Sequence, residues 1–336
     1  MTNSVRWNWI DYIKGICMLM VIMSHSNWPY WYARFFIPVF LTGFFFVSGY
    51  TFSRKRGFGE FFRAKVKSLV VPILCLGSIN AVLATVAEGK TLLDRLWGLV
   101  IQRSGQWDDL WFVACLFTME ILFYVIVMVG KSSNQRMGIC VLLSVIGYFY
   151  IYCGGIALPW HLDTACVLIL FLGLGNWFRE WKYRERFLLY ISSSKGWMWM
   201  ILAMVGYSIS VLVCNNRLTD VHLRQYHVFS MFIISAILGI VTLIVLTIRM
   251  EKYSSLIILK TISFIGQNTL IYYAFQFKAI RLVGLIGERF FSSSTYVGNI
   301  LYCILVSVVL VIPSLIINRY FPFCIGKSVG VKQKKR

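Results

Sequence analysis

The sequence has few charged side chains and very few acidic ones. Only 14% of its 336 residues are Asp, Glu, Lys or Arg, and 13 acidic residues stand against 33 basic ones. A soluble chain of this length would need far more polar surface around its core. The scarcity of charge therefore excludes an ordinary soluble globular protein, and the basic excess needs another explanation.

Paired cysteines are also missing. The nine cysteines form no Cys-x-x-Cys motif, and several, such as Cys115 and Cys166, lie inside apolar runs. Cysteine in such a run behaves as a small hydrophobic residue, so we infer no disulfide. A metal site is not expected either, because His222 and His227 are spaced so that one helical face cannot carry both.

Long hydrophobic runs dominate what is present, since 59% of the residues are hydrophobic. Each run is about 17–21 residues long, close to the roughly 20 that cross a bilayer core. The sequence predicts an all-α polytopic membrane helix bundle of about ten transmembrane helices, forming a single domain over residues 1–336 with a short basic tail at 319–336. The expected spans are Trp9–Trp28, Phe35–Phe52, Ser68–Ala87, Leu110–Gly130, Met137–Cys153, Leu162–Phe178, Trp197–Cys214, Val228–Ile248, Thr261–Ile280 and Ile300–Ile317.

The distribution of Lys and Arg predicts the orientation. With the N-terminus in the cytosol, 23 of the 33 basic residues fall in cytosolic segments and 9 on the other side, while Lys14 lies within the first span. This asymmetry favours cytosolic termini, and it explains the net charge of +20 without a nucleic-acid partner. One outer segment, Thr91–Arg103, has helical amphipathicity typical of an interfacial helix, although an ordinary structured loop fits as well.

The first span carries three ionisable residues: Asp11, Lys14 and His25. A helix advances about 100° per residue, so His25 lies only about 20° past three full turns from Lys14, with Asp11 on the same stripe. Lys14 and His25 are then about 16 Å apart along the axis. Such groups face a protein or water-filled interior, and they mark either a functional site or a structural polar cluster.

The stretch WIDYIKGICMLMVIMSH resembles the opening signature of the acyltransferase-3 family of membrane O-acyltransferases, in which a basic residue beside Gly precedes a His by the spacing seen between Lys14 and His25. Two later segments depart from the family pattern: Gln276 stands where a His is frequent, and the basic run has Arg63, Lys65 and Lys67 in place of a clean Arg-x-x-Arg. The segments that continue the likeness are FFFVSGY (Phe44–Tyr50), the basic run before Pro72, DLWFVACL (Asp109–Leu116), HLDTACVLILFLGLG (His161–Gly175) and IGQNTLIYYAFQF (Ile265–Phe277).

The resemblance implies transfer of an acyl group, usually acetyl, from cytosolic acyl-CoA to a hydroxyl of a surface glycan or its lipid-linked precursor. It implies a bacterial inner membrane, with acetyl-CoA as donor substrate and no permanently bound cofactor. It does not separate lipopolysaccharide, exopolysaccharide or other glycan acceptors. A multi-pass secondary transporter or flippase for a small or lipid-linked substrate is the alternative, and inverted repeats with broken helices would favour it.

A catalytic role follows for the first span. Neutral His is suited to remove a proton from a sugar hydroxyl, so we expect His25 to act as general base, with Asp11 and Lys14 ordering the inner half of the channel. A covalent acyl-histidine and a contact between Lys14 and CoA phosphates remain alternatives.

The donor and acceptor sites are expected at opposite ends. For acyl-CoA we expect Ser48, Gly49, Arg54, Arg63, Lys65 and Lys67, although basic cytosolic loops and helix-packing glycines are ordinary in membrane proteins. For the acceptor we expect Asp109, Trp111, Asp163, Asn268, Tyr272 and Gln276, the last three as one polar stripe on the ninth span. Interfacial anchoring by Trp and hydrogen bonding between helices are the simpler accounts of these residues.

Overall fold

The computed structural model describes residues 8–26, 34–54, 57–88, 91–107, 109–193, 195–214, 219–226, 228–287 and 296–327. Trp28, His227 and residues 328–336 of the basic tail lie outside these ranges. The α-helices are α1 (Asn8–His25), α3 (Phe40–Thr51), α4 (Phe58–Lys65), α5 (Val71–Glu88), α6 (Leu92–Ile101), α7 (Trp111–Val129), α8 (Ser133–Tyr152), α9 (Leu162–Glu180), α10 (Arg184–Ser192), α11 (Gly196–Cys214), α12 (Phe229–Met250), α13 (Ile257–Gln267), α14 (Thr269–Gly287), α15 (Tyr296–Val309) and α16 (Val311–Tyr320).

The fold is an all-α bundle, as predicted. Among the described residues, eight helices are long and apolar enough to cross a membrane, and they coincide with eight of the ten expected spans. The other two expected spans, the first and the ninth, are not among these eight helices. The first, α1, has 18 residues but includes Asp11 and Lys14. The ninth is divided at Asn268 into α13 and α14, so the prediction of one continuous helix there was wrong.

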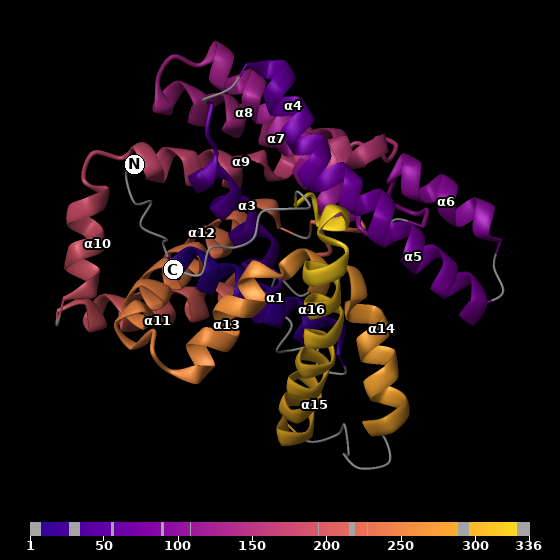
Figure 1. Ribbon diagram of the computed structural model, residues 1–336. Coiled ribbons are helices and arrows are strands. Elements are labelled where there is room, and N and C mark those ends of the chain that lie inside the picture. Colours follow the sequence, from indigo (N-terminus) through magenta and orange to yellow (C-terminus); the bar gives the residue numbers. More distant parts are fainter. Residues whose placement is uncertain are drawn as a thin grey trace.

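Helix α1 runs through the middle of the bundle (Figure 1). It contacts α3, α12, α13, α14 and α15, whereas α9 packs on the far side of α3 and is covered by α8. The segment predicted to be an interfacial helix or a loop forms α6, which packs on α5. A helix surrounded on so many sides can carry ionisable groups, because they need not face lipid.

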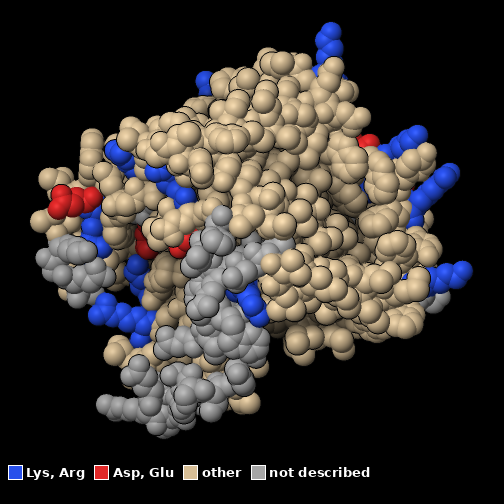
Figure 2. Space-filling model, turned by 180° about the vertical axis from the view of Figure 1, so that it is seen from behind, with Lys and Arg blue, Asp and Glu red and all other residues tan. Residues whose placement is uncertain are grey.

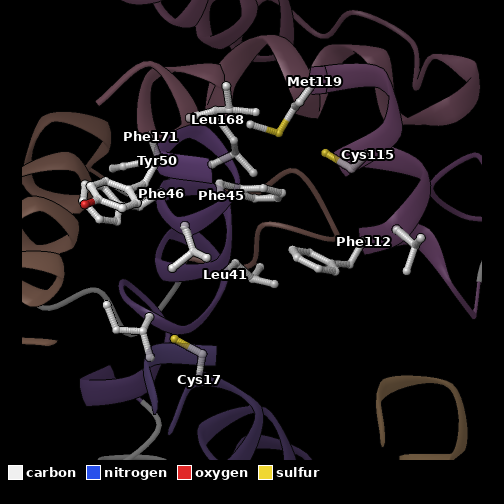
Figure 3. Packing of buried hydrophobic residues seen from close by; sticks show 14 of the residues in the cluster. Cys17, Leu41, Phe45, Phe46, Tyr50, Phe112, Cys115, Met119, Leu168 and Phe171 are labelled. Carbon is white, nitrogen blue, oxygen red and sulfur yellow. The ribbon is translucent and has the colours of Figure 1, made fainter. Parts of the chain in front are cut away.

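The core lies where α3 meets α7 and α9. Figure 3 shows Phe45 of α3 near Phe112 of α7, and Phe46 and Tyr50 of α3 near Phe171 of α9. The ring centroids of Phe45 and Phe112 are 5.0 Å apart. Lipid tails are as apolar as these rings, so the packing stabilises the bundle through close contact rather than through removal of water. This packing fixes α3 and α7, which form walls of the site described below.

Two glycines allow α1 and α13 to approach closely. A Cβ atom on Gly15 would lie 2.2 Å from the carbonyl oxygen of Ile262, and one on Gly266 would lie 1.9 Å from that of Asp11. No larger residue fits at either position without moving the backbone. Small residues at helix crossings are the usual means by which membrane helices pack, and here they fix the position of the helix that carries Lys14 and His25.

Hydrogen bonds near the ends of the bundle join segments that the Lys and Arg distribution places on the same side. At the expected inner end, the Trp9 backbone N–H donates a hydrogen bond to Glu251 Oε1 at 2.9 Å. At the expected outer end, Ser104 Oγ donates to the carbonyl oxygen of His222 at 2.9 Å. Uncharged side chains cover most of the face drawn in Figure 2, and Lys and Arg project mainly from its margins. The terms inner and outer are used for these two ends below.

Candidate active site

The side chain of His25 opens into a cavity of 470 Å³ at the outer end of the bundle. This outer cavity is bounded by Val21 and His25 of α1, by Asp109 and Trp111 at the start of α7, by Gln276 of α14 and by residues 219–222. The imidazole ring of His25 lies against the ring of Phe277, with 4.8 Å between their centroids. The sequence-predicted base is therefore accessible from a space large enough for a sugar.

A short loop, residues 219–226, contributes residues 219–222 to the wall of the outer cavity, and we call it the cap loop. An antiparallel bridge between Asp220 and Gln225 closes the loop on itself. Arg224 anchors it, because its Nε lies 2.6 Å from Asp163 Oδ2 and its Nη2 donates to the Gly155 carbonyl oxygen at 2.6 Å. The Asp163 carboxylate is buried in this ion pair and does not line the cavity, which differs from the acceptor-binding role expected for it.

Gln276 carries polar atoms that the described part of the chain leaves unbonded. Its side chain is fully buried and lines the outer cavity. Neither Nε2 nor Oε1 has a hydrogen-bond partner among the described residues. A buried amide without partners costs on the order of 1–3 kcal/mol, so this arrangement is stabilised when a ligand supplies the missing hydrogen bonds.

Asp109 and Trp111, the residues expected to bind the acceptor at the start of α7, both line the outer cavity. Asp109 Oδ2 accepts a hydrogen bond from Asn80 Nδ2 at 2.8 Å and lies 3.2 Å from Lys278 Nζ. The ring of Trp111 lies 5.1 Å from that of His222, centroid to centroid. An aromatic face beside a fixed carboxylate provides both an apolar surface and hydrogen-bond acceptors for a sugar.

A second cavity of 260 Å³ lies nearer the inner end, and we call it the inner cavity. Lys14 of α1 and Ser48 of α3 supply charged and polar groups to a lining that is mostly apolar. Val21, Leu41 and Tyr273 line the inner and outer cavities alike. The two spaces therefore adjoin one another, with these three side chains at the junction.

One face of α1 runs along both cavities. Lys14, Met18 and Val21 line the inner cavity, and Val21 and His25 line the outer one. The shared stripe predicted from helical periodicity is thus present. Asp11 is buried beside the inner cavity, where its Oδ1 lies 2.9 Å from Lys14 Nζ. Its carboxylate neutralises the ammonium group and fixes where that group points.

Of the basic residues expected to bind acyl-CoA, Lys65 pairs with a buried carboxylate. Glu120 of α7 pairs with Lys65 Nζ at 2.8 Å and accepts a hydrogen bond from Ser48 Oγ. The side chains of Arg54, Arg63 and Lys67 are exposed at the same end and do not line the inner cavity. A π-helical stretch, Val66–Val70, follows Lys65; π-helical turns frequently occur at functional sites.

Three other predicted residues lie away from both cavities. Asn268 caps the break between α13 and α14, and its Oδ1 accepts from Asn318 Nδ2 at 2.7 Å. Tyr272 donates its hydroxyl hydrogen to the Ser307 carbonyl oxygen at 3.0 Å. Gly49 packs against α9, because a Cβ there would meet the Leu172 carbonyl oxygen. The predicted stripe of Asn268, Tyr272 and Gln276 therefore contributes only Gln276 to the outer cavity.

Sequence reasoning missed three groups at the site. Tyr273 lies at the junction of the cavities, next to the predicted Tyr272, which lines neither of them. His222 was considered only as a metal ligand, and its place in the cap loop follows from long-range packing. Glu120 did carry a signal, since a lone carboxylate inside a hydrophobic span is by default a functional candidate.

A comparison with protein families matches this chain to the acyltransferase domain of the acyltransferase-3 family over residues 7–319. No curated protein matches the chain, and no solved structure matches it. The matched range includes every residue of the two cavities. The protein is a multi-pass membrane acyltransferase, and it belongs to the acyltransferase-3 family.

Proposed function

We propose that the protein is an O-acetyltransferase that moves an acetyl group from cytosolic acetyl-CoA to a hydroxyl of a glycan on the outer side of a bacterial inner membrane. One observation carries the proposal. A single face of α1 presents Lys14 to the inner cavity and His25 to the outer cavity, and the two cavities share lining residues. Donor and acceptor can therefore meet inside the bundle from opposite sides.

The inner end suits the donor. CoA phosphates are multiply charged, and the exposed Arg54, Arg63 and Lys67, with Lys65 held by Glu120, provide a basic rim for them. The uncharged arm of CoA fits the apolar inner cavity, with Ser48 and Lys14 along its course. The thioester then reaches the junction near Val21.

The outer end suits the acceptor and the chemistry. His25 takes the proton of the sugar hydroxyl as its oxygen attacks the thioester carbonyl carbon. The carbon–sulfur bond breaks, the acetyl group remains on the sugar oxygen, and the CoA thiolate leaves with the proton returned by His25. The unbonded amide of Gln276 is placed to bind the acceptor or the acyl carbonyl, and Asp109 and Trp111 to hold the sugar.

Proton NMR of the O-acetyl groups on surface glycan tests the proposal. Three kinds of cells are compared: cells without the gene, cells with the wild-type protein, and cells with His25→Ala at the same abundance in the membrane. Ser26→Ala is a matched control, because Ser26 is buried beside His25, bonds to the Ile22 carbonyl oxygen and lines neither cavity. We expect acetylation with wild type and Ser26→Ala, and none with His25→Ala. Acetylation that survives His25→Ala contradicts the role of the base.

Radiolabelled acetyl-CoA on isolated membranes separates the enzyme from a transporter. The proposed enzyme incorporates label covalently into glycan. Label that accumulates in vesicles without entering glycan would instead support the transporter.

A further inference from the structure

A groove of 610 Å³ lies between α6 and the segment that leads from α6 to α7, on the expected outer side. We call it the α6 groove, and its size is within the roughly 300–1,000 Å³ usual for ligand sites. Figure 1 shows α6 beside α5 at the edge of the bundle. Most side chains that line the groove are polar or aromatic: Thr91, Asp94, Arg95, Trp97, Gln106 and Trp107. Such a lining suits a ligand that combines hydroxyl groups with apolar ring faces, as a sugar does.

The α6 groove adjoins the outer cavity. Gln106 and Trp107 line both spaces. The backbone N–H of Gln106 donates to the Arg103 carbonyl oxygen at 3.1 Å and so closes a turn. Ser104 of the same turn donates to the carbonyl oxygen of His222 in the cap loop. A ligand in the outer cavity can therefore continue into the groove, across a wall that is bonded to the cap loop.

Trp107 is held firmly at this shared wall. A Cβ atom on Gly98 of α6 would lie 2.5 Å from the Trp107 carbonyl oxygen, so the helix is in direct contact with this part of the backbone. Arg95 is only 2% exposed, and its guanidinium carbon lies 5.4 Å from the centroid of the Trp107 ring. A cation at this distance is attracted to an indole. The half-buried ring is therefore ordered before a ligand arrives, which lowers the entropic cost of binding.

Asp94 and Trp97 line the α6 groove but not the outer cavity. Asp94 accepts a hydrogen bond from the Thr91 hydroxyl, and a carboxylate can accept further bonds from sugar hydroxyls. Trp97 is 61% exposed and lies one helical turn after Leu93, which is 76% exposed. Trp at this level of a membrane protein is also a common interfacial anchor. Leu93 shares the exposed face without lining the groove, so it can separate anchoring from sugar binding.

We propose that the α6 groove is a second glycan site, which binds the sugar units next to the one acetylated in the outer cavity. The chain crosses Gln106 and Trp107 and then reaches Asp94 and Trp97. The protein thereby recognises a chain of linked units, and a single sugar fills only part of its site. The inference rests on the proposed function, because it extends the acceptor site of the same enzyme.

Binding of glycan fragments to the full-length protein tests the groove without an acyl donor. Surface glycan is labelled by growth of the cells on radioactive glucose, freed of acetyl groups with mild base and partially hydrolysed. Fragments of one, two, three and four sugar units are separated by size. Each is titrated by equilibrium dialysis against purified protein in phosphatidylcholine nanodiscs. The groove variants are Asp94→Asn and Trp97→Ala, both at exposed positions, and Leu93→Ala is the control.

We expect wild type and Leu93→Ala to bind the longest fragments roughly tenfold more tightly than single units, as two or three further hydrogen bonds predict. Asp94→Asn and Trp97→Ala should each lower the affinity for the longest fragments about three- to tenfold. Both variants should leave the affinity for single units unchanged, because those units occupy the outer cavity.

Three results overturn the proposal. The first is wild-type binding that does not increase with length, including no binding of any fragment. The second is a preference for long fragments that persists in both groove variants. The third is a loss in Leu93→Ala as large as that in Trp97→Ala, which would assign Trp97 to anchoring. His25→Ala should keep the dependence on length, so a failed groove and a failed transfer assay are distinguishable.

Discussion

At the scale of single residues, the amide of Gln276 is the most informative group at the site. It is fully buried, it lines the outer cavity and it has no hydrogen-bond partner among the described residues. A residue kept only for packing would be better replaced by an apolar side chain of the same size. The unmet hydrogen bonds of the amide are explained if it bonds to substrate during turnover.

Gln276→Leu should therefore change stability and activity in opposite directions. Replacing both unbonded amide atoms with an apolar group leaves the thermal stability in detergent unchanged or raised. Transfer should fall about 10- to 100-fold, because one or two hydrogen bonds to the substrate are lost. A thermal unfolding curve and the labelled acetyl-CoA assay on the same preparation measure both effects.

The matched control is Gln267→Leu. Gln267 is exposed on α13, and among the described residues its Nε2 donates to Ser263 Oγ of the same helix, at 2.9 Å. We expect this variant to keep wild-type transfer. If Gln276→Leu lowers stability and activity together, the amide has a structural role and does not bind substrate.

The sequence predicted the positions of side chains correctly where the geometry of a single helix determines them. The common face of Lys14 and His25 followed from the fixed advance of an uninterrupted helix. The stripe on the ninth span reaches the outer cavity only at Gln276, because Tyr272 bonds to Ser307 of α15 and Asn268 lies at the break between α13 and α14. The break is stabilised by bonds from the Asn268 side chain to the Phe264 carbonyl oxygen and from Asn318, and the latter contact lies 50 positions away.

At the scale of helices, the crossing of α1 and α13 determines where the site lies. The backbones meet at Gly15 and Gly266, and a Cβ at either position would overlap a carbonyl oxygen of the partner helix. Gly266→Ala must separate the two helices, and overpacking of this kind typically costs about 1–3 kcal/mol. We expect a lower unfolding temperature in detergent and reduced transfer, because Lys14 and His25 move with α1.

Gly206→Ala controls for the change in helix propensity. Gly206 lies within α11, and a Cβ there would have no atom within 4 Å. Alanine in a helix interior is favoured over glycine by roughly 0.5–1 kcal/mol, so this variant should be as stable as wild type or more so. Equal behaviour of Gly206→Ala and Gly266→Ala would contradict the proposed crossing.

The cap loop depends on the buried ion pair between Asp163 and Arg224. Removing one partner from such a pair leaves an uncompensated charge and costs about 3–5 kcal/mol. Asp163→Asn should therefore destabilise the loop and raise the KM for the acceptor, with acyl-CoA binding unchanged because the inner cavity is untouched. Hydrogen exchange of residues 219–226, combined with acceptor titration, measures both consequences.

Two further variants separate this effect from loss of charge alone. The double variant Asp163→Leu with Arg224→Met removes both charges, and it should recover most of the stability. Glu180→Gln breaks an exposed pair with Arg136, and it should cost no more than about 1 kcal/mol. An acceptor KM that is unchanged in Asp163→Asn would show that the loop does not form the acceptor site.

No local pattern predicted the cap loop as part of the site. Its residues are neither amphipathic nor part of a segment that resembles the family, and its position follows from Arg224 reaching the N-terminal end of α9. Eight of the ten expected spans, in contrast, followed from hydrophobic length alone. Element types were therefore predictable from composition, whereas the lining of the outer cavity depended on contacts between distant segments.

At the scale of the whole molecule, the two cavities lie end to end along α1. Ionisable groups lie at their far ends, with Lys14 in the inner cavity and Asp109 and His25 in the outer one. The junction at Val21, Leu41 and Tyr273 is mainly apolar. This arrangement suits passage of an uncharged acyl thioester, and it opposes free movement of ions between the two sides.

Transfer across the bilayer is the central claim, and sided vesicles test it most directly. Right-side-out and inside-out vesicles of cells that make the protein are each given radiolabelled acetyl-CoA from outside, and label in the surface glycan is counted. We expect labelled glycan with inside-out vesicles, whose cytosolic face meets the donor, and none with right-side-out vesicles. Labelling from the outer face, or label that enters vesicles without appearing in glycan, would contradict the account.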